Sequence, residues 1–310
     1  MSADGIVSSI KQPAPGPASR VTSSAPFLGN VRRNPMLVVS SIAILLLVLV
    51  ASFADHLAPY DPTAIHMAGQ LVDGKVLRPP YPPSAEYWLG TDQLGRDIFS
   101  RILSGIRTSL FIGVIVRGGV MIVGIILALL AGQWVGLLRG GILRFTEIML
   151  AFPPLLIAMA LTAALGPSLF TVTVALILVG WPDVVRLIYG QVLVTREMDF
   201  IEAARSIGAT DFRILQRHIL PNLREILIVA FSIGIPGAVM YEAGLSFFGF
   251  GIQPPTPSLG SIISDGRGYI AVAPWYPLFP GLALVLMVLA FNFFGEGLQN
   301  YNKGPNKLTE

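Results

Sequence analysis

Side chains that could carry chemistry are scarce in this chain and gather in a few short segments. Only 13% of the 310 residues are charged, with 21 Lys and Arg against 18 Asp and Glu. There is no cysteine, which excludes disulfides, thiolate metal sites and cysteine nucleophiles. There is also no phosphate-binding GxxxxGKS/T loop, so we expect no ATPase site of that kind. We predict no catalytic residue and no resident cofactor.

One charged segment, DFIEAARSIGATDFRILQRHILPN, lies between two long apolar runs. Asp199 followed by Glu202 has the spacing of a capping box, which predicts that a helix begins there. Gly208 can supply the left-handed residue that ends this helix, and Thr210 can cap a second one. Pro221 is expected to close the second helix, because the residue before proline avoids helical backbone angles. The segment therefore predicts two short helices joined by a sharp turn.

The composition around this segment is that of an integral membrane protein. Hydrophobic residues make up 53% of the chain, and the mean hydropathy is +0.69. A membrane-spanning helix needs about 20 apolar residues, and six runs meet that need if the long uncharged stretch broken by Gly166-Pro167 counts as two. The predicted fold class is thus all-α with six transmembrane helices, at about 36–54, 110–138, 142–165, 168–189, 222–241 and 274–296.

The remaining segments are predicted to be tails, a loop and the two short helices. A tail at 1–35 is rich in Ser, Pro, Ala and Gly and is expected to be flexible; a second tail covers 301–310. The polar loop at 55–107 ends in a run whose apolar residues recur at helical spacing, which predicts an amphipathic helix at the membrane interface. The short helices cover 199–220.

The distribution of Lys and Arg predicts which side of the membrane each loop occupies. With six spans both termini share a side, and that side carries 14 of the 21 basic residues, against seven on the other. Because basic residues are enriched in cytoplasmic loops, both termini and the 199–220 helices are predicted to be cytoplasmic. His56 and His66 then face His218 across the membrane, so we assign no metal site.

The spacing within the charged segment resembles a known family signature. Glu202-Ala203-Ala204, then three residues, Gly208, and later Leu220-Pro221 follow the pattern E-A-A-x3-G-x9-I-x-L-P of bacterial ABC importer permeases, with His218 in place of the Ile. In that family the segment is the coupling helix, which docks on a cytoplasmic ATPase subunit. The resemblance implies this coupling role for Glu202, Ala203, Ala204, Gly208, Leu220 and Pro221.

Two further segments, LGTDQLGRDIFSRILSGIRTSL and EAGLSFFGFGIQPPTPSLGSII, resemble the same family's peptide-importing branch. With the charged segment, they make the permease region at 36–300 similar to the C-type subunit of dipeptide and oligopeptide permeases, which have the MetI-like fold. The resemblance implies a homologous second permease, two cytoplasmic ATPase subunits that bind ATP and Mg, and an extracytoplasmic substrate-binding protein. It implies peptide cargo, a bacterial inner-membrane location and no nucleic-acid partner.

Isolated charges near the spans are interpreted more simply. Arg117 is expected to extend toward the outer interface rather than contact cargo. Asp183 and Arg186, spaced i, i+3, predict a local ion pair. Glu147 and Glu242 are expected to be solvated or paired near an interface. The aromatic loop GLSFFGFGIQPP could belong to an outer gate, a docking surface or a packed re-entrant loop. Pro153-Pro154 and Pro236 are expected to kink their helices.

Two other classes of protein explain the charged segment poorly. A membrane-embedded enzyme would need a cluster of reactive side chains at one depth. A stand-alone secondary transporter would need discontinuous helices or ionisable groups at the membrane centre. The cargo is left open, because related permeases import nickel, glutathione, haem or sugars, and selection resides largely in the binding protein.

Overall fold

The computed structural model describes residues 34–67, 70–72, 75–133 and 136–303. Most of the two predicted tails, 1–35 and 301–310, lies outside these residues. The described chain is mostly helical, with a long loop between α3 and α4 that carries a two-stranded hairpin, in which β1 (Gln70–Val72) pairs antiparallel with β2 (Lys75–Leu77). The helices are α2 (Pro35–Ser52), α3 (Ala54–Leu57), α4 (Ile98–Gln133), α5 (Leu137–Leu150), α6 (Pro154–Leu165), α7 (Leu169–Arg196), α8 (Asp199–Ser206), α9 (Asp211–Ile214), α10 (Leu220–Phe247), α11 (Leu259–Gly266) and α12 (Trp275–Lys303).

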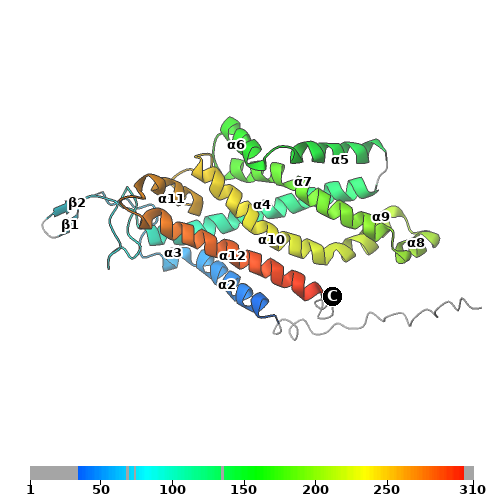
Figure 1. Ribbon diagram of the computed structural model, residues 1–310, viewed down its shortest axis with the longest axis horizontal. Helices are drawn as coiled ribbons and strands as arrows, with labels where there is room; N and C mark the ends of the chain where they lie inside the picture. Colours follow the sequence, from blue (N-terminus) through cyan, green and yellow to red (C-terminus); the bar gives the residue numbers. More distant parts are fainter. Residues whose placement is uncertain (1–33, 68–69, 73–74, 134–135, 304–310) are drawn as a thin grey trace, which may run out of the picture.

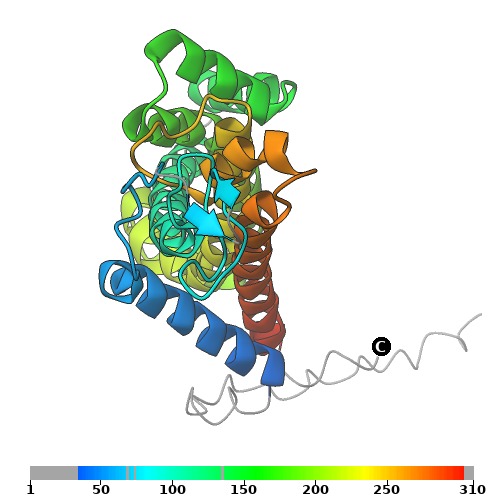
Figure 2. The ribbon, with the colours of Figure 1, turned by 90° about the vertical axis from the view of Figure 1, so that its left-hand side faces the viewer.

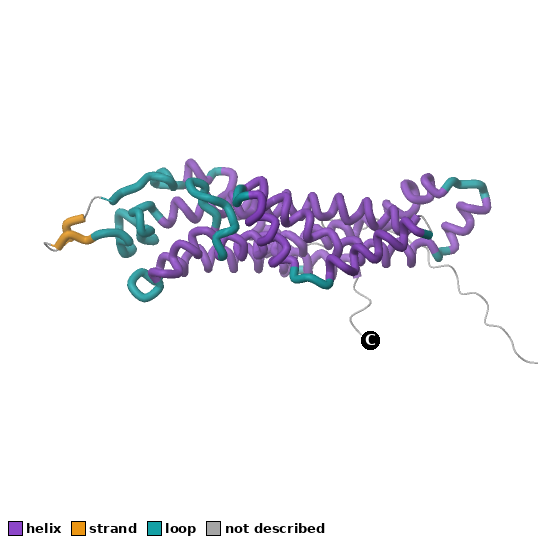
Figure 3. Tube along the Cα trace, turned by 90° about the horizontal axis from the view of Figure 1, so that it is seen from above, coloured by secondary structure: helices purple, strands orange, loops and turns teal. Residues whose placement is uncertain are grey.

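The long helices form one elongated bundle with loops gathered at its two ends (Figures 1 and 3). The β-hairpin lies at one end, called the hairpin end below, and α8 and α9 lie at the other, the α8–α9 end. The first turn of α2 and the last turns of α12 point toward the α8–α9 end, and Asn34 Nδ2 donates a hydrogen bond to the Gly297 carbonyl at 3.3 Å.

Within the described residues, five helices are long and apolar enough to cross a membrane, and α5 with α6 makes a sixth span if the bent pair counts as one. The two halves of that pair meet at an angle of 89°. Pro153 has extended backbone angles and Pro154 occupies the first turn of α6, which stops helical hydrogen bonding at this point. The kink predicted at Pro153-Pro154 is therefore confirmed as a sharp bend.

Helices α4 and α10 are the centre of the bundle, because both contribute to its two apolar clusters. One cluster joins them to α6 and α7, and the other joins them to α2, α11 and α12. Viewed along the bundle, α2 and the α5–α6 pair lie on opposite sides of it (Figure 2). Large apolar side chains on α2, among them Leu45 and Leu46, are more than half exposed, as expected for a helix that faces lipid.

Close contact between α4 and α7 depends on small residues. A Cβ atom at Gly124 would lie 2.5 Å from Val184 Cγ1, and one at Gly132 would lie 2.6 Å from Val192 Cγ1. Since lipid tails are as apolar as these side chains, helices in a membrane associate through such close packing rather than through the hydrophobic effect.

The prediction of a separate amphipathic helix at the membrane interface, at the end of the 55–107 loop, is wrong. Residues from Ile98 onward belong to α4, which runs unbroken to Gln133. The apolar residues Ile98, Ile102 and Ile106 are buried in the cluster with α11 and α12. The periodic pattern therefore reflects packing against protein on several sides and not a boundary between lipid and water.

Candidate functional site

The charged segment forms a helix, a sharp turn and a helix at the α8–α9 end. Gly208 has a φ of +84°, the left-handed value predicted for it. Its N–H donates to the Arg205 carbonyl, and the Ala209 N–H donates to the Ala204 carbonyl. These two bonds make a Schellman motif that satisfies the last carbonyls of α8. The Thr210 side chain accepts from the Arg213 N–H at 3.4 Å, which confirms the cap predicted for the second helix.

The capping box predicted at Asp199 is not formed. The N-cap residue of α8 is Met198, which makes no side-chain cap, and Asp199 is already in the first turn. The Met198 carbonyl already accepts hydrogen bonds from the Ile201 and Glu202 N–H groups, so the N-cap lies one residue before Asp199. Asp199 and Glu202 still place negative charge at the positive end of the α8 dipole.

The prediction that Pro221 closes the second helix is also wrong. A π-helical turn, Leu215–Ile219, follows α9 and leads directly into α10, so that Pro221 lies in the first turn of α10. The Leu220 N–H donates to the Leu215 carbonyl across this wider turn. A π turn changes the hydrogen-bond register, so the proline ring and its missing N–H are accommodated without a break.

Most side chains of the sequence motif are open to solvent in this chain. Glu202, Ala203, Gly208, Leu220 and Pro221 are exposed, whereas Ala204 is buried. The motif residues thus lie on one continuous piece of chain, with Leu220-Pro221 at the junction between the short helices and the long α10.

Two exposed apolar side chains beside the turn are not part of the sequence motif and were not predicted as functional residues. Ile207 is 86% exposed and Phe212 is 65% exposed, one on each side of Gly208. By contrast, Ile201 and Ile214 are fully or almost fully buried in the main apolar cluster and anchor the segment to the bundle. Exposed apolar residues in a charged segment are the sequence signal that could have found this surface.

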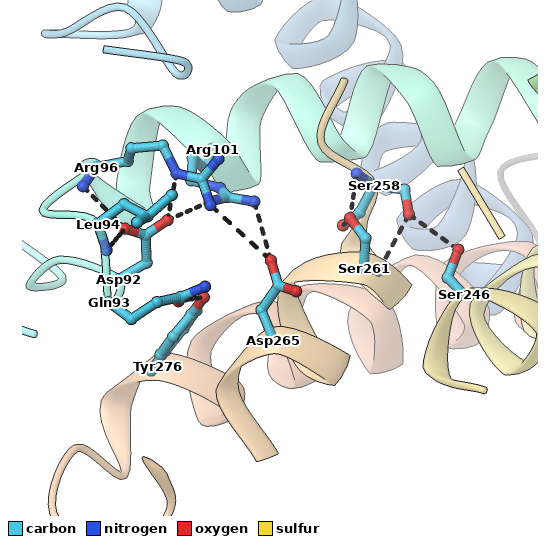
Figure 4. A network of polar contacts seen from close by, with 10 residues as sticks. All are labelled: Asp92, Gln93, Leu94, Arg96, Arg101, Ser246, Ser258, Ser261, Asp265 and Tyr276. Carbon is cyan, nitrogen blue, oxygen red and sulfur yellow. Dashed lines mark hydrogen bonds and ion pairs between the residues drawn. The ribbon is translucent and has the colours of Figure 1, made fainter. Parts of the chain in front are cut away.

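The hairpin end carries a buried network of charges (Figure 4). Asp92 is completely buried and accepts hydrogen bonds from the Leu94 N–H at 2.8 Å, from the Arg96 N–H at 2.9 Å and from Arg96 Nε at 2.6 Å. Arg101 Nη1, from the first turn of α4, donates to the same carboxylate. These contacts join the loop before α4 to the helix itself.

Asp265 on α11 extends this network to a second element. Its carboxylate lies 3.5 Å from Arg101 Nη2 and 3.9 Å from Arg96 Nη2. Burial raises the pKa of Asp265, and the charges of Arg101 and Arg96 oppose that rise. The Tyr276 hydroxyl at the start of α12 donates to the Gln93 side chain. The network therefore holds the loop, α4, α11 and α12 together at this end.

Glu242 is not solvated and forms no ion pair with any residue that the structure describes, which corrects the prediction made for it. The side chain is completely buried and accepts from Ser109 Oγ at 3.2 Å and from Ser246 Oγ at 2.8 Å. Glu147, in contrast, is exposed and pairs with Arg144 at 3.2 Å, as predicted. The aromatic loop after α10 buries Ile252, whereas Gln253, Pro254 and Pro255 are exposed before α11 begins.

Arg117 and Asp183 also depart from their predictions. Arg117 turns into the bundle and donates from Nε and Nη2 to the Ala230 carbonyl on α10, at 3.1 and 2.6 Å, instead of extending to the interface. Asp183 lies near the middle of α7, and no ion pair with Arg186 forms among the described residues. Both side chains line one cavity between α4, α6, α7 and α10.

Within the part of the chain that the structure describes, five long apolar helices, a bent sixth span and an exposed helix-turn-helix at one end indicate a multi-pass membrane protein. Residues 121–303 match the family model of the binding-protein-dependent transport system inner membrane component, and residues 27–80 match that of the N-terminal transmembrane domain of oligopeptide transport permease C. The chain belongs to the family of binding-protein-dependent transport system inner membrane components.

Similar proteins come from several bacteria. The chain is 38% identical to a probable D,D-dipeptide transport system permease of Escherichia coli over 278 residues, 90% of each chain. It is 40% identical to a glutathione transport system permease of Pectobacterium atrosepticum over 274 residues, 88% of each. It is 38% identical to a dipeptide transport system permease of Alkalihalophilus pseudofirmus over 293 residues, covering 93% of this chain and 92% of the relative.

Proposed function

We propose that this chain is one half of the translocation pathway of an ATP-driven importer for di- and oligopeptides. In this proposal a homologous permease forms the other half, two ATPase subunits supply the energy, and a binding protein delivers cargo from outside. Support comes from the exposed α8–Gly208–α9 segment, which presents charged and apolar side chains beyond the end of the bundle. Peptide cargo is supported by the two dipeptide permeases among the relatives.

The coupling role is assigned to Glu202, Ala203, Ala204, Gly208, Leu220 and Pro221. The exposed members and the neighbouring Ile207 would enter a groove on an ATPase subunit. The segment is joined to α7 by a two-residue link and to α10 without any break. Closure of the ATPase pair would therefore displace both long helices together, which is a rigid-body form of alternating access.

The orientation follows from the same assignment. ATPases are cytoplasmic, so the α8–α9 end and both termini would be cytoplasmic, and the hairpin end would face the binding protein. The excess of Lys and Arg on the α8–α9 side supports this orientation. The buried network at the hairpin end would then hold the docking surface in shape.

Uptake of labelled di- and tripeptides by cells with and without this gene tests the proposal. We expect uptake to fall in the deleted strain and to return with the wild-type gene but not with Gly208→Pro, since proline cannot adopt the positive φ of the turn. Glutathione serves as the second cargo, because relatives of this chain include glutathione permeases. If the deleted strain takes up peptides as well as the wild type but no longer takes up glutathione, the cargo would be glutathione, and the proposed importer function would still hold.

A further inference from the structure

A cavity of about 180 Å³ lies in the middle of the bundle, between α4, α6, α7 and α10. Its lining combines two opposite charges, Arg117 and Asp183, with the Tyr241 side chain and with glycine and apolar residues. The charges come from different helices, so the site is assembled by the fold and has no counterpart in any single sequence motif.

The depth of this cavity makes its charges unusual. Helix α7 has 28 residues, and Asp183 lies near its centre; at about 1.5 Å per residue, each end of the helix is roughly 20 Å away. The Asp183 side chain is exposed in this chain and forms no hydrogen bond or ion pair with any residue that the structure describes. A bare carboxylate at this depth is too costly to face lipid and must face water, cargo or another subunit.

Arg117 is held in a position that leaves part of its guanidinium available. Nε and Nη2 donate to the Ala230 carbonyl, and a guanidinium has five N–H donors. The side chain lies directly over Gly234, where a Cβ atom would be 1.8 Å from Nε. Because Gly234 has no side chain, the Arg117 guanidinium has room to pack against the α10 backbone at this position.

Two of the helices that line the cavity contain a proline, although both remain continuous α-helices. Pro182 precedes Asp183 on α7, and Pro236 precedes Gly237 on α10. Each proline lacks the N–H that would bond the carbonyl four residues earlier, which leaves a polar carbonyl without its helical donor. Charged groups within membrane spans typically face a solute path or a neighbouring subunit rather than lipid.

We propose that this cavity is a transient binding site for zwitterionic cargo, in which Asp183 pairs with an ammonium group and Arg117 with a carboxylate. This proposal rests on the proposed function and deepens it, because it names the residues that would form ion pairs with the charged groups of the cargo. The exposed side of Asp183 faces the pathway, and the second permease closes that side away from lipid.

Cysteine accessibility tests the site directly, since the chain has no cysteine of its own. Gly237→Cys is suitable because a Cβ atom there meets nothing within 4 Å and the residue lines the cavity. Leu46→Cys on α2 is the matched control, exposed to lipid on an outer face of the bundle. The assembled importer in liposomes is treated with small cationic or anionic methanethiosulfonates, and modification of this chain is followed by mass.

We expect G237C to react at least tenfold faster than L46C in one or more nucleotide states and L-alanyl-L-alanine to slow the reaction. Adding Asp183→Asn should lower the ratio of cationic to anionic reagent rates about tenfold, and adding Arg117→Gln should raise it by a similar factor, the size expected for a charge-assisted contact. Asp183→Asn removes no hydrogen bond or ion pair with any residue that the structure describes, and melting temperature in mild detergent checks that the variant is folded.

Three outcomes would overturn the inference. G237C could react no faster than L46C in every nucleotide state, Asp183→Asn could leave the reagent ratio unchanged, or dialanine could give no protection. Binding-protein-stimulated ATP hydrolysis in the same liposomes distinguishes failure of the proposed cargo site from failure of the proposed importer function. If hydrolysis is intact but G237C is not modified faster than L46C, or the reagent ratio does not respond to Asp183→Asn, the binding site alone is rejected. Loss of the ATPase subunits from the wild-type complex rejects both the importer and the site.

Discussion

The two ends of the bundle use charge in opposite ways. At the hairpin end Asp92 is completely buried and bonded to two arginines, and Arg101 is 3% exposed. At the α8–α9 end the charged side chains of α8 are exposed, and so is the apolar side chain of Ile207. Buried charges that bond to one another hold one arrangement of elements, while exposed apolar groups among charges are typical of a surface that binds a partner. The first end is built to keep its shape and the second to make contacts.

The largest stability effect is expected from Asp92→Ala. Removal of this carboxylate leaves two buried guanidinium groups without their shared acceptor, which costs about 3–5 kcal/mol in comparable buried pairs. Thermal unfolding in mild detergent, followed by size-exclusion chromatography, measures the loss. Glu202→Ala on exposed α8 is the control. Similar melting temperatures for the two variants would contradict the claim that the hairpin end contributes more to stability than the α8–α9 end.

The next effect is expected on binding at the α8–α9 end. Ile207→Asp and Phe212→Asp each place a charge where an apolar contact with the ATPase is proposed, and a central interface residue contributes about 2 kcal/mol or more. Each variant should retain the wild-type melting temperature but weaken ATPase binding by more than about tenfold. Titration of purified ATPase subunits onto immobilised permease gives this number. Wild-type affinity in both variants would show that the exposed surface has another use.

An intermediate effect is expected at Glu242, which is buried yet bonded only to serine hydroxyls. Glu242→Ala leaves Ser109 and Ser246 without an acceptor and should destabilise the protein by about 1–3 kcal/mol. Glu242→Gln keeps one acceptor oxygen and should cost less. Melting temperatures of the two variants, measured side by side, rank them. A larger loss for Gln than for Ala would contradict this account of the buried serine cluster.

The smallest effect is expected from Thr210→Ala. Loss of the cap on α9 should cost about 1 kcal/mol within that short helix. Hydrogen exchange resolved to peptides should speed up in residues 211–214 and stay unchanged at the hairpin end. Faster exchange throughout the protein would show that the α8–α9 end supports the whole fold, against the division of roles described above.

The spans and the turn at Gly208 could be read from the sequence because each depends on local composition. Charge-free runs predict membrane helices, and glycine between two helix signals predicts a left-handed turn. The burial of Arg101, Arg117 and Glu242 could not be read in the same way. Their partners Asp92, Ala230 and Ser109 lie on other elements or come together only when α4, α10 and α11 pack.

The same limit explains the errors at the ends of helices. Asp199 has the residue type of an N-cap, yet the Met198 carbonyl accepts the first helical hydrogen bonds and α8 begins one residue earlier. Pro221 has the residue type of a helix stop, yet the preceding π turn lets the helix continue. Residue type gives a local preference, and the connection to neighbouring elements determines whether that preference is realised.

The central claim is that the α8–α9 end binds the ATPase subunits. Affinity purification from mild detergent tests it most directly, with wild type, a Glu202→Arg and Gly208→Pro double variant, and Leu46→Cys as a control for substitution elsewhere. We predict that mass spectrometry finds a second permease and the ATPases with wild type and with the control, and the second permease alone with the double variant. ATPases that remain bound to the double variant at wild-type levels would contradict the claim.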